Sequence, residues 1–386
     1  MTEWIECTLD KLGEIVGGAT PSTKCEDYYG GSIPWITPKD LSSFKGRYIT
    51  SGERNITEKG LASCSAQMMP KDAVLFTSRA PIGYVAIASQ SVCTNQGFKS
   101  IVVNEKADPL FVYYLLKYNK DAIEAMGSGT TFKEVSGKTM RAVKVRIPLD
   151  VSYQKRIAAV LDSLDTKIEN NERINDNLLA QAQTLYKQFF PYGVQDDLPD
   201  GWRIGTVGEI IEIHDSKRIP LSGADRSKME KKSYPYYGAA SLMDLVDNYI
   251  FDGKYLLLGE DGTVVDDAGY PILQYVWGQF WVNNHAHILT GRLGYDVESL
   301  YMLFKQTPVK SIVTGAVQPK ISQANLRSVQ VVIPPEHNLR EYNDLVEPLF
   351  SLFRANEEEC KTFTALRDTL LPKLMSGEID VSAVQL

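Results

Sequence analysis

Residues 152–190 read SYQKRIAAVLDSLDTKIENNERINDNLLAQAQTLYKQFF. The apolar positions of this segment, together with Asn171, Asn175 and Ala182, recur alternately every three and four residues. A spacing that averages about 3.5 residues is typical of a coiled-coil seam, so we predict one helix roughly 58 Å long at 1.5 Å per residue. Ser152 is the expected N-cap of this helix. The predicted seam positions are Ile157, Leu161, Leu164, Ile168, Asn171, Leu178 and Leu185.

A second helical stretch runs from Pro335 to Met375 and matches the first when the numbering is shifted by 185. Two equivalent helices, each following a region of similar size, predict a duplicated protein whose halves meet through an antiparallel helix pair. Pro348 and Pro372 lie inside the second stretch, so we expect a kink or a break there. The seam positions predicted for this helix are Leu349, Phe353, Asn356, Phe363 and Leu370.

The regions in front of the two helices also repeat. Near their ends a constant shift of 186 relates Gly129 to Gly315, Ser136 to Ser322, Arg141 to Arg327, Val145 to Val331 and Pro148 to Pro334. We therefore predict four parts: 1–150 as a first domain, 151–192 as a central helix, 193–334 as a second domain, and 335–386 as a C-terminal helix. The expected fold class is α/β (α+β), with two mixed domains joined by two long antiparallel, coiled-coil-like helices in a pseudo-two-fold repeat. Residues 222–237 show no counterpart in the first half.

Short alternating or β-branched runs predict strands, and two compact apolar segments, 109–118 and 300–305, predict short helices. Residues 27–36 hold aromatic side chains among glycines and prolines, and we expect an irregular loop surface there. Residues 136–139, SGKT, lack the earlier glycine of a phosphate-binding loop and are expected to form a turn before a strand. The predicted strands are 73–77, 84–88, 100–103, 143–148, 255–258 and 279–282.

Composition places the chain among ordinary globular proteins, with 386 residues, 44% hydrophobic and 23% charged. No apolar run approaches the length of a membrane span, and the N-terminus lacks the pattern of a secretory signal, so we expect a cytoplasmic protein with no membrane partner. The five cysteines include no C-x-x-C pair, which gives no indication of a disulfide framework or a zinc site.

The net charge of −7 is unevenly distributed along the chain. Residues 1–150 carry a net charge of +2, residues 193–334 carry −4 and residues 335–386 carry −5. An acidic total does not exclude nucleic acid as a partner, because binding depends on the local field of one face. It does predict that such a face is narrow, or that partner chains supply much of the positive charge.

Side chains with catalytic or metal-binding chemistry are few. Asn284-His285-Ala286-His287 would place two imidazoles on one face of a strand, but no cysteine lies near, and we expect structural or hydrogen-bonding roles and no metal. No nucleophile motif, dinucleotide motif or adenine methyltransferase motif is present. The chain is therefore expected to be non-catalytic.

Basic and amide side chains gather in the loops of both domains. Lys and Arg on phosphates, with Asn, Gln or Arg on base edges, are the mixture that recognition of duplex DNA needs, although solvated loop charges would look the same. The candidate DNA-binding residues are Lys39, Lys45, Arg47, Arg79, Asn95, Gln96, Lys133, Lys217, Arg218, Arg226, Asn284, His285, Gln318 and Lys320.

The chain resembles the specificity (S) subunits of type I restriction–modification enzymes over essentially its whole length. The residues that carry the resemblance are QKRIAAVLDSLDTKIENN at 154–171, RDTLLPKLMSGEI at 367–379, GATPS at 18–22, IPWI at 33–36 and YIFDG at 249–253. The resemblance implies two target recognition domains, each binding one half of a split, asymmetric DNA site, with the helices setting the gap. It also implies two methyltransferase (modification) subunits that transfer methyl from S-adenosylmethionine to adenine N6, restriction subunits with motor and nuclease activity as further partners, and no cofactor bound by this chain.

Two alternatives remain open from the residues alone. A non-catalytic protein–protein adaptor or scaffold would explain the helix seam and the acidic charge, but it leaves two different loop surfaces on one frame unexplained. An enzyme, such as a nuclease, would have to use His285, His287 and Asp261. Steep salt dependence of binding would favour DNA over a protein partner, because phosphate contacts release counterions.

Overall fold

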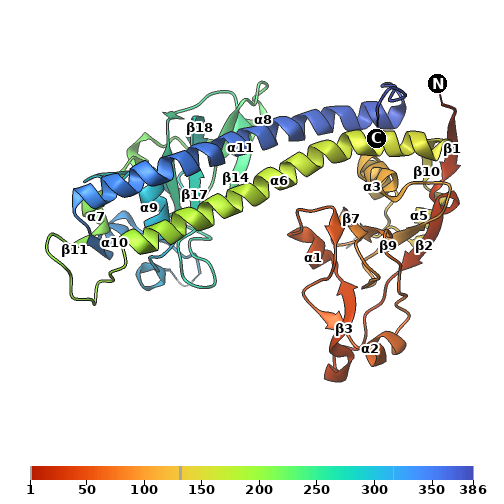
Figure 1. Ribbon diagram of the computed structural model, residues 1–386, viewed down its shortest axis with the longest axis horizontal. Coiled ribbons are helices and arrows are strands. Elements are labelled where there is room, and N and C mark those ends of the chain that lie inside the picture. Colours follow the sequence, from red (N-terminus) through yellow and green to blue (C-terminus); the bar gives the residue numbers. More distant parts are fainter. Residues whose placement is uncertain (1, 130–132, 316, 386) are drawn as a thin grey trace. The chain divides into compact units, whose positions relative to one another are not determined.

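The computed structural model describes residues 2–129, 133–315 and 317–385, and the chain divides into two compact units. Unit 1 comprises Met1–Arg173 with Glu357–Leu386, and unit 2 comprises Ile174–Asn356. Each unit mixes helices and strands, which confirms the predicted mixed α/β class (Figure 1). Both long helices contribute residues to each unit.

Unit 1 is built on three sheets of described strands. These strands are β1 Trp4–Thr8, β2 Gly13–Gly17, β3 Tyr29–Ile36, β4 Tyr48–Ile49, β5 Asn55–Ile56, β6 Val74–Ser78, β7 Ile82–Ala88, β8 Cys93–Thr94, β9 Lys99–Val103 and β10 Lys144–Pro148. The strand orders are β2-β9-β6-β7-β4, β5-β3-β8 and the antiparallel pair β1-β10. The helices are α1 Pro38–Ser42, α2 Glu58–Ala62, α3 Pro109–Tyr118, α4 Lys120–Ala125, α5 Gly137–Ala142 and α6 Val151–Phe189.

Unit 2 follows the same plan. Its strands are β11 Arg203–Thr206, β12 Ile211–Ile213, β13 Tyr234–Tyr237, β14 Leu242–Val246, β15 Phe251–Asp252, β16 Tyr255–Gly259, β17 Leu273–Val276, β18 Gln279–Val282, β19 Ala286–Gly291 and β20 Gln330–Ile333. They are ordered β12-β19-β16-β17, β14-β13-β18-β15 and β11-β20. The helices are α7 Val207–Ile210, α8 Gly223–Ser227, α9 Val297–Phe304, α10 Gln323–Arg327 and α11 Glu336–Ser376.

The repeat extends further than the sequence indicated. Each unit contains an equivalent parallel strand pair. In unit 1 β3 pairs with β8, and in unit 2 β13 pairs with β18. Residues 222–237 have no clear counterpart in the sequence of the first half, yet they contain β13, which occupies the place of β3. Strand pairing depends on backbone hydrogen bonds, which different side chains can share.

Two local predictions in unit 1 were wrong. Residues 29–36 form strand β3, and Trp35 is buried while its indole N–H donates to the carbonyl of Ala19 at 3.0 Å. The pairing of β3 shifts register between Tyr29 and Ile33, an irregularity that accommodates the neighbouring glycines and proline. Ser136, expected in a turn, caps helix α5 by accepting from the Thr139 N–H at 3.0 Å.

Helix α6 is continuous from Val151 to Phe189, close to the predicted span. Its first turn is capped by Asp150 and not by Ser152, because the Asp150 carboxylate accepts from the Ser152 N–H at 2.8 Å. Helix α11 runs unbroken from Glu336 to Ser376, so the predicted break at Pro348 and Pro372 was wrong. Both prolines are exposed, and water can satisfy the carbonyls that lose a helical partner there.

The predicted seam positions are all buried or half-buried in the units where they lie. In unit 1 the Asn171 amide donates to Glu359 at 2.6 Å. In unit 2 the Asn356 amide donates to the Asn175 side-chain oxygen at 2.9 Å. In each unit, contacts advance along α11 as they retreat along α6, which makes the segments antiparallel. Two further buried residues of α6, Asp165 and Tyr186, each lie one position after a predicted leucine.

Each unit ties its part of the helix pair to the rest of the unit through a buried carboxylate. In unit 1 Asp165 of α6 accepts from the hydroxyl of Tyr114 on α3 at 2.7 Å and from Arg367 of α11 at 2.8 Å. In unit 2 Glu298 of α9, which has no exposed surface, accepts from Tyr275 of β17 at 2.7 Å and from Arg354 of α11 at 3.1 Å. Among the described residues, none of the helices combines the length and apolar character needed to cross a membrane.

Candidate nucleic-acid interface

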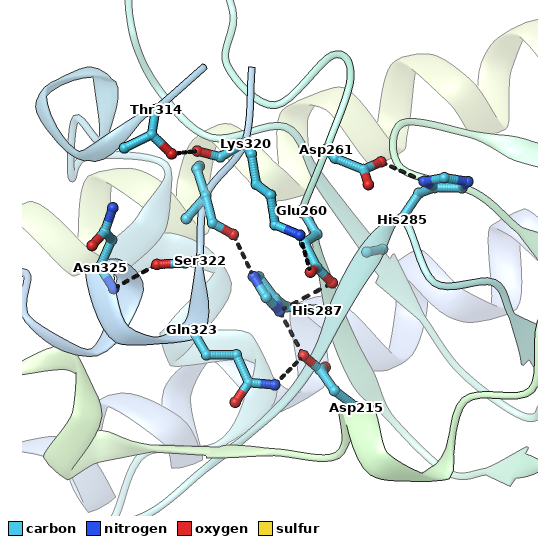
Figure 2. A network of polar contacts seen from close by, with 12 residues as sticks. Asp215, Glu260, Asp261, His285, His287, Thr314, Lys320, Ser322, Gln323 and Asn325 are labelled. Atoms are coloured by element: carbon cyan, nitrogen blue, oxygen red, sulfur yellow. Dashed lines mark hydrogen bonds and ion pairs between the residues drawn. The ribbon is translucent and has the colours of Figure 1, made fainter. Parts of the chain in front are cut away.

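A polar corner of unit 2 forms where β16 ends, β19 begins and the chain returns toward α10 (Figure 2). The Glu260 N–H donates to the carbonyl of His285 at 2.8 Å, and the Ile321 N–H donates to the carbonyl of Glu260 at 2.8 Å. These two bonds lock three separate segments together. We define corner 2 by the side chains of Glu260, Asp261, His285, His287 and Lys320, together with Asp215 and Arg218 beneath them.

The inner layer of corner 2 is buried. His287 on β19 has no exposed surface, its Nδ1 lies 2.7 Å from the Asp215 carboxylate, and its Nε2 lies 2.8 Å from the Ile321 carbonyl oxygen. Asp215, in the 3₁₀ turn Asp215–Lys217, also accepts from the Ile288 N–H at 3.0 Å. Both ring nitrogens of His287 therefore join parts of the framework, and the ring offers no open edge to a ligand.

Two cations balance the buried carboxylates. Arg218 places Nη1 2.5 Å from Glu260 and Nη2 3.3 Å from Asp215. Lys320 places its Nζ 3.2 Å from the other oxygen of Glu260. Burial would raise the pKa of Asp215, but the hydrogen bond from His287 and the charge of Arg218 hold it below its ordinary value. Burial also opposes ionisation of Glu260, and Arg218 likewise lowers the pKa of that carboxyl.

Asp215, Glu260 and His287 bring three potential metal-ligating atoms within 4.8 Å of one another. A metal would need those oxygens and that nitrogen free of other partners. Arg218 and Lys320 already bind the same carboxylates, and both ring nitrogens of His287 face oxygen acceptors. The chemistry of this donor set fits a network neutralised by protein cations.

The outer layer of corner 2 faces solvent. The side chains of Lys320 and His285 are 49% and 44% exposed, respectively. His285 lies just before β19 and its Nδ1 contacts Asp261, whereas His287 lies inside the strand. The prediction that both imidazoles share one strand face was therefore wrong, because the two rings occupy different layers and bind different carboxylates.

The same backbone frame recurs in unit 1. The Ser78 N–H donates to the carbonyl of Gly97 at 2.7 Å, and the Val135 N–H donates to the carbonyl of Ser78 at 3.0 Å. Ser78 thus occupies the place of Glu260, Gly97 that of His285, and Val135 that of Ile321. We define corner 1 by the residues Ser78, Arg79, Gly97, Lys99 and Glu134; their counterparts in corner 2 are, in the same order, Glu260, Asp261, His285, His287 and Lys320.

The charges of corner 1 are arranged around Glu134. Arg79 lies 3.3 Å from one of its carboxylate oxygens and Lys99 lies 3.6 Å from the other. Glu134 and Arg79 are 38% and 34% exposed, and Lys99 is 16% exposed. Corner 1 therefore has an anion at the position where corner 2 has Lys320, and a cation where corner 2 has Asp261.

Arg47 is a structural residue. Its side chain is buried, and its guanidinium donates to the Asp162 carbonyl at 3.1 Å and to Thr166 at 2.9 Å, both on α6. Glu169 lies 3.2 Å away, and the surrounding carboxylates keep the pKa of Arg47 above its ordinary value against the effect of burial. Since these contacts occupy both terminal nitrogens of the buried guanidinium, we leave Arg47 out of the DNA-binding set.

The other predicted cations differ in their exposure and in their partners. Arg226 is mostly buried, paired with Asp244 at 2.8 Å and placed over the Tyr236 ring at 5.0 Å, so it braces its loop. Lys39 and Lys45 are each 79% exposed, with Glu53 at 2.8 Å and Glu172 at 3.9 Å. Lys133 and Lys217 are exposed as well.

The predicted amide side chains also differ in their exposure and in their partners. Asn95 is half-buried and accepts from the Gly97 N–H at 2.8 Å, and Gln96 contacts the Thr20 hydroxyl. Asn284 and Gln318 are exposed. Asn95 and Gln96 directly precede Gly97 of corner 1, while Asn284 directly precedes His285 of corner 2. The structure thus brings together two local groups of the predicted residues.

The candidate DNA-binding set left out three carboxylates, Asp215, Glu260 and Glu134. They orient the cations of the two corners, and each is distant in sequence from at least one partner. One signal was available: the 186-residue shift that relates the domain ends also relates Glu134 to Lys320. Chemically, both corners present charged hydrogen-bonding groups held at fixed positions, which suits phosphates and base edges.

Comparison with known proteins gives matches along nearly the whole chain. The family model of the type I restriction modification DNA specificity domain matches residues 1–180 and again residues 199–359. The type I restriction enzyme MjaIX specificity subunit of Methanocaldococcus jannaschii is 30% identical, over 98% of this chain and 94% of that protein. The EcoR124I/EcoR124II specificity subunit of Escherichia coli is 28% identical, over 48% and 46%. The S subunit of a type I system from M. genitalium has a similar fold, with a TM-score of 0.60 at 18% identity over 97% and 96% of the two chains.

Proposed function

This chain belongs to the type I restriction–modification DNA specificity family, and on that premise we propose that it recognises a split, asymmetric duplex site, one half with each recognition domain. Members of the family are non-catalytic, and this chain would supply specificity to two modification subunits. Those subunits would bind S-adenosylmethionine and methylate adenine N6, and restriction subunits with motor and nuclease activity would join them.

One observation carries this proposal: corners 1 and 2 share a backbone frame but differ in side-chain chemistry. The frame is defined by the same two hydrogen bonds in each unit, while Glu134 in one is replaced by Lys320 in the other. A frame that only held the fold together would not need charged, half-exposed side chains at its rim. Two different rims are what recognition of two different half-sites requires.

The acidic total of the chain shapes the proposed mode of binding. A net charge of −7 gives little general attraction to phosphate, so the positive charge of the modification subunits would hold the complex on DNA. The corners would then contribute specificity more than affinity. Binding that weakens steeply with salt is expected for the assembled complex, with a smaller slope for this chain alone.

The long helices would set the gap between half-sites whose centres lie roughly 34 Å apart, about one turn of DNA. Inserting seven residues after Arg173 and seven after Asn356 preserves the heptad spacing of both helices and adds roughly 10 Å at 1.5 Å per residue. The gap should grow by about three base pairs, at roughly 3.4 Å each, with both half-sites unchanged. Altered half-sites with the original gap would contradict the spacer role.

The decisive experiment is sequencing of modified adenines in cells that express this chain with its modification subunits, compared with cells that lack this chain. A split motif that disappears with the chain would establish the function and identify both half-sites. An unchanged motif, or none, would refute it. Binding to partner proteins that persists at high salt without a DNA motif would favour the adaptor function.

A further inference from the structure

Corner 2 has an inner layer of buried, paired side chains beneath an exposed amine. Asp215 and His287 are almost fully buried, and Arg218 and Glu260 have side chains only 13% exposed. Burying four ionisable groups is costly unless each is paired, and hydrophobic packing often stabilises a fold as well. Such a network is therefore better explained by the position it imposes on a surface group than by stability alone.

That surface group is Lys320. Its Nζ lies 3.2 Å from Glu260 Oε1, while the other Glu260 oxygen is 2.5 Å from Arg218. The Lys320 backbone is also fixed, because its N–H donates to the Thr314 carbonyl at 2.8 Å and its carbonyl accepts from the Thr314 N–H at 2.9 Å. Figure 2 shows the amine aimed at Glu260 from the loop side. An ordinarily flexible side chain is thus held at both ends.

The ammonium group of Lys320 has three N–H donors, and Glu260 accepts from one of them, which leaves two for a ligand. The side chain remains 49% exposed, so donors are accessible from solvent. In the major groove guanine presents two acceptors, O6 and N7, and Lys or Arg donating to that pair is the commonest specific contact. A phosphate would accept the same donors, but it does not require an oriented amine.

We propose that Lys320 is a specificity-determining residue of the second recognition domain, donating to O6 and N7 of a guanine, with Glu260 as its positioning residue. This rests on the proposed function and adds the residue and the base. Corner 1 carries Glu134 at the equivalent position, so the first domain cannot donate to guanine from there. The guanine therefore belongs to the half-site of the second domain.

The test compares modification motifs made by the full complex containing wild-type chain, Lys320→Met or Lys310→Met. Lys320→Met keeps most of the aliphatic length and removes the donors, while Lys310 is an exposed lysine of the same unit outside corner 2. We expect Lys320→Met to lose preference for guanine at one position, by roughly 5- to 150-fold, with the other half-site and the gap unchanged. Lys310→Met should leave the motif unchanged.

Two further variants separate positioning from folding. Lys320→Arg keeps donors for O6 and N7, so it should retain the guanine preference that Lys320→Met loses. Glu260→Gln should reduce that same preference while leaving other positions intact, an outcome that general loss of stability would not produce. Thermal melts of each variant identify any that fail to fold.

The inference is overturned if Lys320→Met folds and keeps a full motif, or if the relaxed position holds a base pair without guanine. Uniform weakening at all positions would assign Lys320 to phosphate and also overturn it. Failure of the proposed function is a separate result, because it would leave the wild-type chain with no split motif at all.

Discussion

Corner 1 surrounds one half-exposed carboxylate, Glu134, with two cations, whereas corner 2 surrounds the buried Asp215 and the mostly buried Glu260 with Arg218, His287 and Lys320. The backbone hydrogen bonds beneath them are the same. The difference shows which part of a duplicated domain must be kept and which part can change. Backbone hydrogen bonds between separate segments fix the frame, and they do not depend on side-chain identity. The rim can then exchange charge without disturbing the fold.

The two corners should also differ in energy. Exposed ion pairs contribute about 0–1 kcal/mol, since water competes with them, whereas removing one member of a buried pair leaves an uncompensated charge. Corner 2 should therefore be coupled strongly to the stability of unit 2, and corner 1 only weakly to that of unit 1.

The largest effect is expected for Asp215→Ala. This substitution leaves buried His287 and Arg218 without their shared carboxylate, so it should destabilise unit 2 by about 3–5 kcal/mol. Glu134→Ala is the matched change in corner 1 and should cost less than about 1 kcal/mol. Equilibrium unfolding in urea, followed by tryptophan fluorescence, measures both. Equal losses would show that the two corners are energetically alike.

Charge reversal at Glu134 should have the next largest effect, on recognition. Glu134→Lys places a third cation beside Arg79 and Lys99, so discrimination at the first half-site should fall by about 1–3 kcal/mol while the second half-site is unaffected. Glu6→Lys makes the same charge change at an exposed position outside the corner and serves as the control. Competition binding with half-site variants measures both. If the control has the same effect, general electrostatics and not the corner is responsible.

Acid should weaken unit 2 more than unit 1 through the partly or fully buried carboxylates of the two units. Burial raises the pKa of Asp162 and Glu169 in unit 1, whereas the pKa values of Asp215 and Glu260 in unit 2 are lowered despite burial, by their hydrogen bonds to His287 and Arg218. A carboxyl whose pKa is lower in the folded than in the unfolded protein stabilises the fold above the unfolded pKa of about 4. That stability is lost as the pH falls through the pKa of the folded protein. A carboxyl whose pKa is higher in the folded protein destabilises the fold when it is ionised, and protonation at low pH removes that cost.

Hydrogen exchange followed by mass spectrometry at pH 6 and pH 3, corrected for intrinsic rates, resolves the two units. Protection of β16 and β19 should decrease more than protection of β6 and β9. Asp215→Asn cannot be protonated in this range, so it should reduce the acid sensitivity of unit 2. A uniform loss of protection in both units would contradict the predicted difference.

The smallest effect is expected at the exposed lysines. Lys39 is 79% exposed and pairs with Glu53, so Lys39→Ala should leave the stability of unit 1 nearly unchanged. If Lys39 contacts a phosphate, the slope of log binding constant against log salt should fall by about 0.9 without any change in motif. A changed motif would move Lys39 into the group of base-contacting residues.

Much of the architecture could be predicted from local patterns. The 3.5-residue spacing of 152–190 predicted α6, and the apolar segment at 109–118 corresponds to α3 Pro109–Tyr118. The predictions failed where distant partners decide the outcome. Residues 29–36 looked irregular, yet pairing with β5 and β8 makes them a strand. The prolines of α11 looked disruptive, yet they lie on its exposed side.

The amino-acid sequence by itself determined that this protein is a repeat of two mixed domains, each followed by a long seam-forming helix, because periodicity and internal similarity are properties of the chain. Tertiary structure alone decided which charges are available to a ligand. Arg47 and Lys320 are both loop-borne cations in the sequence, but Arg47 is buried against α6 while Lys320 remains half-exposed above Glu260. The burial and pairing of these two cations depend on Glu260 and Asp162, which lie 60 and 115 positions away in the chain, and no local pattern encodes such contacts.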